Sequence, residues 1–219
     1  MKPKKNIRGD AKERILDVSE KLFAEGSYAS VSVRTVTTEA KVNLSAVNYY
    51  FGSKQGLFQA VYVRRAKQMN HERLCLLAKA EEQSRAEGRD VTLKEILGAI
   101  LTPPIFWLYD QEKGLSGYIR FLARAYLEEA SDMNHVLRQE VDVFDRFVPY
   151  LQKINPGLSE EDIYWDIHFT MGTMHHTINH LDRISLLSHK ACKVGTREQT
   201  RDRLVNFCAE GFAGQENAG

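Results

Sequence analysis

The stretch VNLSAVNYYFGSK, from Val42 to Lys54, places an asparagine, two adjacent tyrosines and a lysine in one short segment. Asn43 is a suitable N-cap for a helix from Leu44 to about Tyr50, and Gly52 is a suitable stop. On that helix the apolar side chains, Val47 among them, should point inward. A helix of about two turns with a polar and aromatic outer face fits the major groove of DNA, which is about 12 Å wide. The side chains expected on the outer face are those of Leu44, Ser45, Asn48 and Tyr49.

Two further short helices should precede this one. Asp10 is a suitable N-cap for the first, Glu13 resembles the second half of a capping box, and Gly26 should end the helix. Ser32 is a natural N-cap for the second, which should end near residues 41–42. Residues 10–54 would then hold three helices, the last two joined by a turn of about three residues, which is the spacing of a helix-turn-helix.

The side chains of the outer face suit two kinds of contact, some to DNA bases and others to phosphates. The amide of Asn48 suits adenine, Leu44 suits a thymine methyl group, and Ser45 suits a base or a phosphate. The tyrosine hydroxyls, Lys54 and the N-terminus of the second helix suit phosphates, which position the protein without specifying sequence. The alternative for the tyrosines is packing against neighbouring helices. The predicted DNA-binding residues are Ser32, Arg34, Leu44, Ser45, Asn48, Tyr49, Tyr50 and Lys54.

Charge and composition agree with a DNA-binding head. Residues 1–54 hold ten Lys and Arg against six Asp and Glu, a net +4, whereas the remaining residues hold 20 against 23, a net −3. A basic head on a mildly acidic body favours a polyanionic partner. We see no apolar run long enough to span a bilayer, no signal peptide and no disulfide framework among the three widely spaced cysteines. We therefore expect a cytoplasmic protein without a membrane partner.

The remainder of the chain also reads as helix, so the predicted fold class is all-α. We expect a head of residues 1–54 and a larger helical body of residues 55–219. Pro103 and Pro104 should break or kink the helix that contains them. The helices expected in the body span residues 53 to the mid-80s, 92 onward, 116–129, 132–154, 159–184 and 196–212.

The run SVRTVTTEAKVNLSAVNYYFGSKQGLFQAV, from Ser32 to Val61, resembles the DNA-binding head of the TetR family of bacterial transcriptional repressors. The resemblance covers about the first 60 residues. Two positions depart from the family pattern: Lys41 stands where glycine is usual in the turn, and Asn48 where tyrosine is common. If the turn needs a positive φ at Lys41, the side chain strains it modestly. The resemblance implies a non-enzymatic repressor without a cofactor, whose body dimerises through the last two long helices and binds a small molecule.

Two apolar stripes in the C-terminal third agree with a dimer. One recurs at steps of three and four residues along the segment 163–181, and the second lies on the last helix. A dimer also suits a palindromic DNA site. The alternative is that both stripes are core of a single chain. The predicted dimer-interface residues are Ile163, Ile167, Met174, Ile178, Leu181, Leu204, Phe207 and Gly211.

Aromatic and polar side chains in FWLYD, YIRFLARAYLEE and YWDIHFTMGTMHH have the composition of a ligand pocket, although a stripe of this kind also suits ordinary core. SEEDIYWDIHFTMG is similar to the PsrA-like regulators of fatty-acid metabolism, which implies a fatty acid or acyl-CoA effector. Aromatic compounds and lipophilic drugs remain alternatives. The predicted pocket residues are Phe106, Trp107, Tyr118, Phe121, Leu122, Arg124, Trp165, His168, Phe169 and Met171.

Other function classes have weaker support in the sequence. His175, His176 and His180 have a spacing that can bind zinc, but no third kind of ligand lies at an obvious spacing, so we predict no metal site. We find no glycine-rich phosphate loop and no nucleophile or metalloprotease motif. An architectural DNA-binding protein without a ligand is the other alternative. We predict a dimeric repressor that a small lipophilic effector releases from a palindromic operator.

Overall fold

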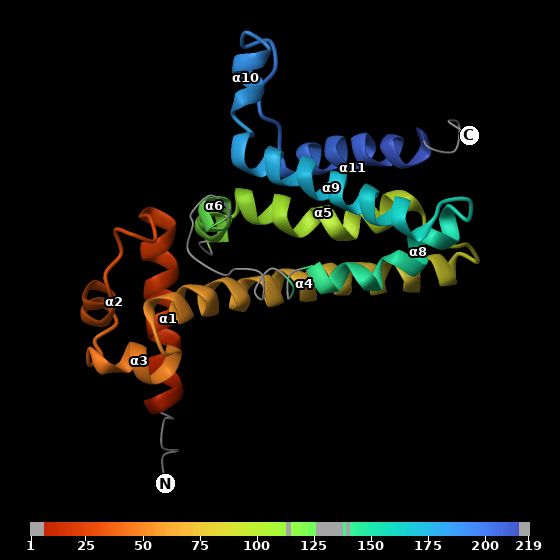
Figure 1. Ribbon diagram of the computed structural model, residues 1–219. Coiled ribbons are helices and arrows are strands. Elements are labelled where there is room, and N and C mark those ends of the chain that lie inside the picture. Colours follow the sequence, from red (N-terminus) through yellow and green to blue (C-terminus); the bar gives the residue numbers. More distant parts are fainter. Residues whose placement is uncertain (1–6, 113–114, 126–137, 139–140, 215–219) are drawn as a thin grey trace. The chain divides into compact units, whose positions relative to one another are not determined.

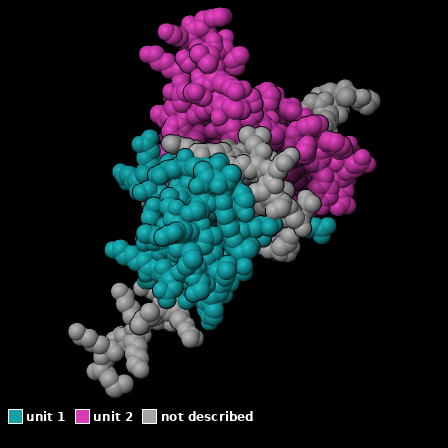
Figure 2. All heavy atoms as spheres, turned by 60° about the vertical axis from the view of Figure 1, so that its left-hand side comes forward, with its two compact units in different colours: residues 1–66, 111–139 teal, residues 67–110, 140–219 magenta. Residues whose placement is uncertain are grey.

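The computed structural model describes residues 7–112, 115–125, 138 and 141–214 (Figure 1). Every regular element in that part of the chain is a helix, which confirms the all-α prediction. Two compact units divide the chain, residues 1–66 with 111–139 and residues 67–110 with 140–219 (Figure 2). No helix within the described ranges is both long and apolar enough to cross a membrane.

The helices of the first unit begin and end mostly where local chemistry predicts. Ser32 caps α2 (Val33–Glu39), because its hydroxyl accepts the Thr35 N–H at 3.0 Å. The φ of Gly52 is 75°, which ends α3 (Ser45–Phe51). The hydroxyl of Ser53 accepts the Gly56 N–H at 3.0 Å at the start of α4 (Lys54–Ala86). All three predicted boundaries are confirmed.

Two predicted caps are wrong. Helix α1 (Ile7–Glu25) begins before Asp10, which therefore lies inside the helix instead of capping it. The N-cap of α3 is Leu44, which has helical backbone angles and no side chain able to cap. Asn43 contributes its backbone carbonyl instead, which accepts the Ala46 N–H at 2.9 Å.

An aromatic cluster forms the centre of the first unit. Phe23 of α1, Phe58 of α4 and Phe121 of α6 (Leu115–Ala125) are buried, with ring centroids 4.9–6.1 Å apart. Tyr118 is also buried and lies against Phe121. Packing of α1 on α2 and α6 thus gives the small helix-turn-helix a larger support than its own side chains supply.

In the second unit, α5 (Leu93–Tyr109) packs against α8 (Val148–Ile154), α9 (Glu160–His180) and α11 (Arg197–Gly214). Capping boxes at Thr92 and Ser159 start α5 and α9. The expected helix 132–154 is interrupted in its described part: residues 138 and 141 are helical, and a 3-10 helix (Asp142–Arg146) precedes α8, which has Pro149 in its first turn. The expected helix 159–184 is also interrupted, because α9 ends at His180 and a separate α10 (Arg183–Leu187) follows.

We expected Pro103 and Pro104 to break or kink their helix; α5 continues through both, so a break is wrong. Both prolines are buried, and Arg73 supplies a hydrogen-bond donor that Pro104 lacks.

Candidate nucleic-acid interface

Helix α3 buries one side and exposes the other. Val47 is fully buried, whereas Leu44 is 60% and Tyr49 71% exposed. Ser45 and Asn48 are exposed as well. The predicted orientation of the helix is therefore confirmed, and hydrogen-bonding and apolar groups share one outward face of a seven-residue helix.

The turn before α3 is held in place from both sides. Lys41 has a φ of 54°, so this position does adopt the left-handed conformation that favours glycine. The Val42 N–H donates to the Thr37 carbonyl at 3.0 Å, and the Arg14 Nε of α1 donates to the Ala40 carbonyl at 3.1 Å. The exposed Lys41 side chain thus sits on a turn whose backbone is fixed.

The candidate phosphate-binding side chains differ in their exposure and in the contacts that they already make within the chain. Arg34 is exposed, whereas the exposed Ser32 hydroxyl already bonds the backbone and hydroxyl of Thr35. Tyr50 is half-buried and meets Tyr49 edge to face, with centroids 4.9 Å apart.

Lys54 is positioned by a residue that sequence reasoning missed. Its Nζ lies 4.3 Å from the centre of the Tyr28 ring, and the side chain is half-buried. A cation over an aromatic face is stabilised by the ring quadrupole. Tyr28 lies between α1 and α2, 26 positions before Lys54, so no local sequence pattern indicates this contact.

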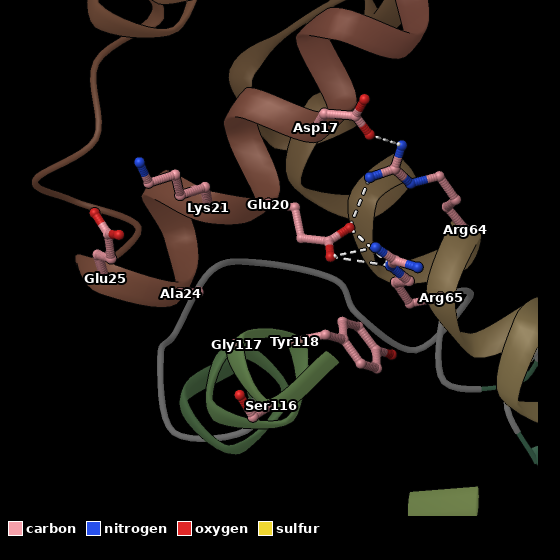
Figure 3. A pocket seen from close by; sticks show the side chains of 10 residues that line it. All are labelled: Asp17, Glu20, Lys21, Ala24, Glu25, Arg64, Arg65, Ser116, Gly117 and Tyr118. Carbon is pink, nitrogen blue, oxygen red and sulfur yellow. Dashed lines mark hydrogen bonds and ion pairs between the residues drawn. The ribbon is translucent and has the colours of Figure 1, made fainter. Parts of the chain in front are cut away.

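A charged network ties α1 to α4 beside an open hollow of about 480 Å³ (Figure 3). Glu20 of α1 points to two arginines of α4: it accepts from Arg65 at 2.7 and 2.9 Å and from Arg64 at 2.6 Å. Arg64 also donates to Asp17 at 2.7 Å. Burial opposes the charge of Arg64, but the bonds to Glu20 and Asp17 outweigh it and raise its pKa. Residues 116–118 of α6 line the other side of the hollow.

The predicted pocket residues occupy several separate environments. Tyr118 and Phe121 belong to the aromatic cluster of the first unit, and the side chains of Leu122 and Arg124 lie outside the described residues. In the second unit Trp107 is buried and donates its Nε1–H to Glu72 at 2.8 Å. Phe106 is half-buried beneath Arg197 and Arg201.

The pocket residues predicted on α9 lie mainly at its surface. Trp165 is 52% and Phe169 58% exposed, with the two rings stacked at 5.6 Å. His168 is exposed and Met171 half-buried. In the single chain the exposed three face outward instead of into the body.

The predicted dimer residues also divide between core and surface. Phe207 is 68% exposed, Gly211 is exposed and Leu181 is half-buried. The rest are buried within one chain, so most of the α9 stripe is core of the protomer. These buried residues are Ile163, Ile167, Met174, Ile178 and Leu204.

The histidine group does not extend to a metal site among the described residues. The rings of His176 and His180 lie 5.1 Å apart. The described ranges hold no group of three or more His, Cys, Asp or Glu side chains arranged to hold a metal ion.

Comparisons with known proteins agree with this architecture. Residues 15–61 match the bacterial regulatory proteins of the tetR family, and residues 98–211 match the tetracyclin repressor-like C-terminal domain. An uncharacterized HTH-type transcriptional regulator of Xanthobacter autotrophicus is 36% identical over 104 residues. That match covers 44% of this chain and 48% of the relative, so the chain spans about half of its length.

Solved structures share the fold at low sequence identity. A tetR-family regulator from Mesorhizobium loti has a TM-score of 0.60 at 16% identity, over 96% of this chain and 98% of that chain. The fatty acid degradation regulator FadR from Bacillus halodurans has a TM-score of 0.61 at 12% identity, over 88% and 97%. With both its head and more than half of its length matched, the chain belongs to the TetR family of transcriptional regulators, which are DNA-binding proteins and not enzymes.

Proposed function

We propose that this regulator is a homodimeric repressor that occupies a palindromic operator and leaves it when a small lipophilic effector binds the body. Residues 1–54 would read DNA, and residues 55–219 would bind the effector and dimerise. The protein would act in the cytoplasm, where its DNA is. The observation that carries the proposal is the outward face of α3, with Leu44, Asn48 and Tyr49 exposed above a buried Val47.

On this proposal Asn48 reads an adenine, Leu44 contacts a thymine methyl group, and Ser45 serves a base or a phosphate. Lys54, Arg34 and the tyrosine hydroxyls bind phosphates. The Ser32 hydroxyl would contribute less, because it already accepts a backbone N–H. The exposed Lys41 joins the phosphate-binding set as a candidate that replaces the usual glycine of the turn.

Dimerisation is supported by the exposed aromatic side chains of α9 and α11. Trp165, Phe169 and Phe207 are each more than half exposed, and a groove of about 510 Å³ lies between Phe169 of α9 and Gly211 of α11. Exposed apolar surface of this kind is typical of an interface between proteins. A dimer also suits a palindromic operator, whose two half-sites lie about 34–36 Å apart, one turn of DNA.

The effector class rests on the PsrA-like segment at the start of α9, which favours an acyl chain over aromatic compounds and lipophilic drugs. Release would follow if the effector binds a state whose half-site spacing no longer fits the operator. The regulators in this family generally act as dimers with small-molecule effectors.

Binding of the parent and of Asn48→Ala to DNA from upstream of its own gene, in low salt, tests the DNA-reading assignment. The parent should protect a palindromic site, and Asn48→Ala should lose about 1–3 kcal/mol of discrimination at one base pair per half-site. Lys79→Ala, an exposed change on α4, is the matched control. Equal sequence preference of parent and Asn48→Ala would show that α3 reads DNA with another face.

Thermal unfolding against fatty acids, acyl-CoA esters, aromatic acids and lipophilic cations tests the effector class. A ligand at about 100 times its dissociation constant adds about 2.7 kcal/mol to the unfolding free energy. Each kcal/mol raises Tm by about 2–4 °C for a chain of this size. A shift with aromatic acids but not with acyl compounds would refute the acyl assignment and leave the repressor intact.

A further inference from the structure

Helix α10 and its flanks present apolar side chains to solvent. We call residues 181–195 the arm, because it projects beyond the C-terminal end of α9 before the chain returns into α11 (Figure 1). Leu186 is 74% and Leu187 76% exposed, and Ile184 and Val194 are also exposed. Because burying exposed leucine side chains is favourable, this surface gains from a partner that covers it.

The arm is basic as well as apolar. It holds Arg183, Lys190 and Lys193 against Asp182, so with neutral His189 its net charge is 3 − 1, or +2. All four of these charged residues are exposed. A partner surface for the arm should therefore be apolar and acidic.

The opposite end of α9 has these properties. Residues 159–169 contain four acids, Glu160, Glu161, Asp162 and Asp166, and no Lys or Arg, and two of these acids, Glu160 and Glu161, are exposed. An open hollow of about 610 Å³ there is lined by two of these acids and by aromatic and imidazole side chains. We call this the acidic aromatic end. The lining residues are Glu160, Glu161, Tyr164, Trp165 and His168.

The arm and the acidic aromatic end cannot meet within one chain. They lie at opposite ends of α9, and Trp165 and Leu181 are 16 positions apart, which corresponds to about 24 Å at 1.5 Å per residue. If a two-fold axis crosses the middle of α9, the arm of one copy lies against the acidic aromatic end of the other. The same contact then forms a second time with the two copies interchanged, as in any isologous interface.

The exposed face of α9 suits such an axis. Trp165, Phe169, Gly172 and His176 follow at steps of four, three and four, so they share one face, and all are exposed. Gly172 lies near the middle of this face, where an added Cβ would meet nothing within 4 Å in the chain. Two helices can therefore approach closely at this point.

We propose that the arm of each protomer docks on the acidic aromatic end of α9 in a second copy of this chain. Leu186 and Leu187 pack on Trp165 and Tyr164, and the arm lysines face Glu160 and Glu161. The inference rests on the proposed dimer and adds a reciprocal, charge-matched contact that selects this chain's own copy over other regulators of the family.

Charge reversal with rescue tests the contact by sedimentation equilibrium. Lys190→Glu with Lys193→Glu, and separately Glu160→Lys with Glu161→Lys, should each raise the dimer dissociation constant about tenfold or more. The four changes together should restore it to within about threefold of the parent. Because all four residues are exposed in the single chain, the circular dichroism spectra of the variants should match that of the parent.

Disulfide trapping gives a second measurement that does not depend on affinity. In a Cys75→Ser background, Glu161→Cys should form an interchain disulfide with the exposed native Cys192 under mild oxidation and run at twice the mass on a non-reducing gel. Lys79→Cys in the same background is the exposed control and should not. Removing Cys192 as Cys192→Ser should abolish the trapped species.

The outcomes separate this inference from the proposed function. A parent that is dimeric, with no rescue by the four-residue swap and no more trapping at 161 than at 79, overturns the arm contact and leaves the dimer standing. A parent that stays monomeric with DNA present overturns both. Binding to phosphatidylglycerol vesicles that Leu186→Ser with Leu187→Ser abolishes, without any change in dimerisation, would overturn the arm contact by assigning the arm to a membrane surface.

Discussion

The Nε of Arg73 donates a hydrogen bond to the backbone carbonyl of Ile100, 3.1 Å away. This is the carbonyl that the N–H of residue 104 would bond in an ordinary helix, and residue 104 is a proline without an N–H. Arg73 is fully buried, donates to Asn70 Oδ1 at 2.9 Å and lies 5.1 Å from the centre of the Phe144 ring. The arginine thus replaces a missing helical donor from outside the helix.

Replacing Arg73 by Met should therefore lower the free energy of unfolding, and Pro104→Ala should offset part of that loss. The Arg73→Met change leaves the Ile100 carbonyl without its donor, at a cost of about 1–3 kcal/mol. Restoring the N–H at residue 104 supplies a helical donor to the same carbonyl. Urea unfolding of both single variants and the double variant should give a favourable coupling of about 0.5–3 kcal/mol. Additive single effects would show that the two residues act independently.

Lys41→Gly should stabilise the head. At a φ of 54° a side chain with a Cβ is strained, and glycine relieves that strain by about 0.5–1 kcal/mol after its own unfolded-state entropy is counted. Differential scanning calorimetry should show Tm higher by about 2–4 °C per kcal/mol. Lys41→Ala removes the same charge but keeps the Cβ, so it should give no gain. A rise in Tm with alanine equal to that with glycine would assign the effect to the charge.

Lys54→Ala should weaken binding to operator and to unrelated DNA by similar factors. Loss of one phosphate contact should reduce the slope of log affinity against log salt by about 0.9. Tyr28→Leu removes the ring that lies 4.3 Å from the ammonium and should produce a smaller loss in the same direction, measured by fluorescence anisotropy over a salt series. A loss confined to the operator would assign Lys54 to base reading instead.

Glu20→Gln should destabilise the first unit far more than Glu13→Gln. Glu20 is only 7% exposed and accepts from both Arg64 and Arg65, so its loss should cost about 1–3 kcal/mol. Glu13 has a 62% exposed side chain 3.4 Å from Arg64, and its loss should change stability by less than about 0.5 kcal/mol. Urea unfolding followed by far-ultraviolet circular dichroism measures the free energy of unfolding of both variants. Equal losses of stability in the two variants would show that burial of Glu20 does not strengthen its bonds to the arginines.

Glu95 should contribute to stability in a defined acid range. Its hydrogen bonds from Arg89, and then those at Thr92, lower the pKa of its carboxyl to about 2. A lowered folded-state pKa means that the contribution is present above the unfolded value of about 4.3 and is lost as the pH falls from there to about 2. The stability difference between parent and Glu95→Gln should shrink over that range in urea unfolding series. Glu82→Gln, an exposed change, controls for general acid effects, and a difference independent of pH would contradict the assignment.

How much could be predicted from the sequence depends on how local the cause is. The caps at Ser32 and Ser53, the stop at Gly52 and the inward position of Val47 follow from hydrogen bonds and helical spacing within a few residues, and all were predictable. The caps at Asp10 and Asn43 were equally local signals, but the observed helices start at other residues. Short-range chemistry therefore names good candidate boundaries without ranking them.

The sequence pattern of α9 is limited in a similar way, because it identifies an apolar face without showing whether the chain itself or a second copy covers that face. The periodicity of α9 correctly shows that Ile163, Ile167 and Met174 share an apolar face, but a stripe does not state what covers it. Within one chain α5 and α11 pack against α9, and the aromatic side chains left exposed include Trp165 and Phe169.

The family, the helix-turn-helix and the outward face of α3 can be read from the order of residues alone, because they depend on neighbours along the chain. Which face of α9 is exposed, how Lys54 contacts Tyr28, and why α5 continues through two prolines become visible only in the folded chain. Those outcomes depend on partners distant in sequence, such as Arg73 for Ile100, whose contributions exist only once the chain has packed.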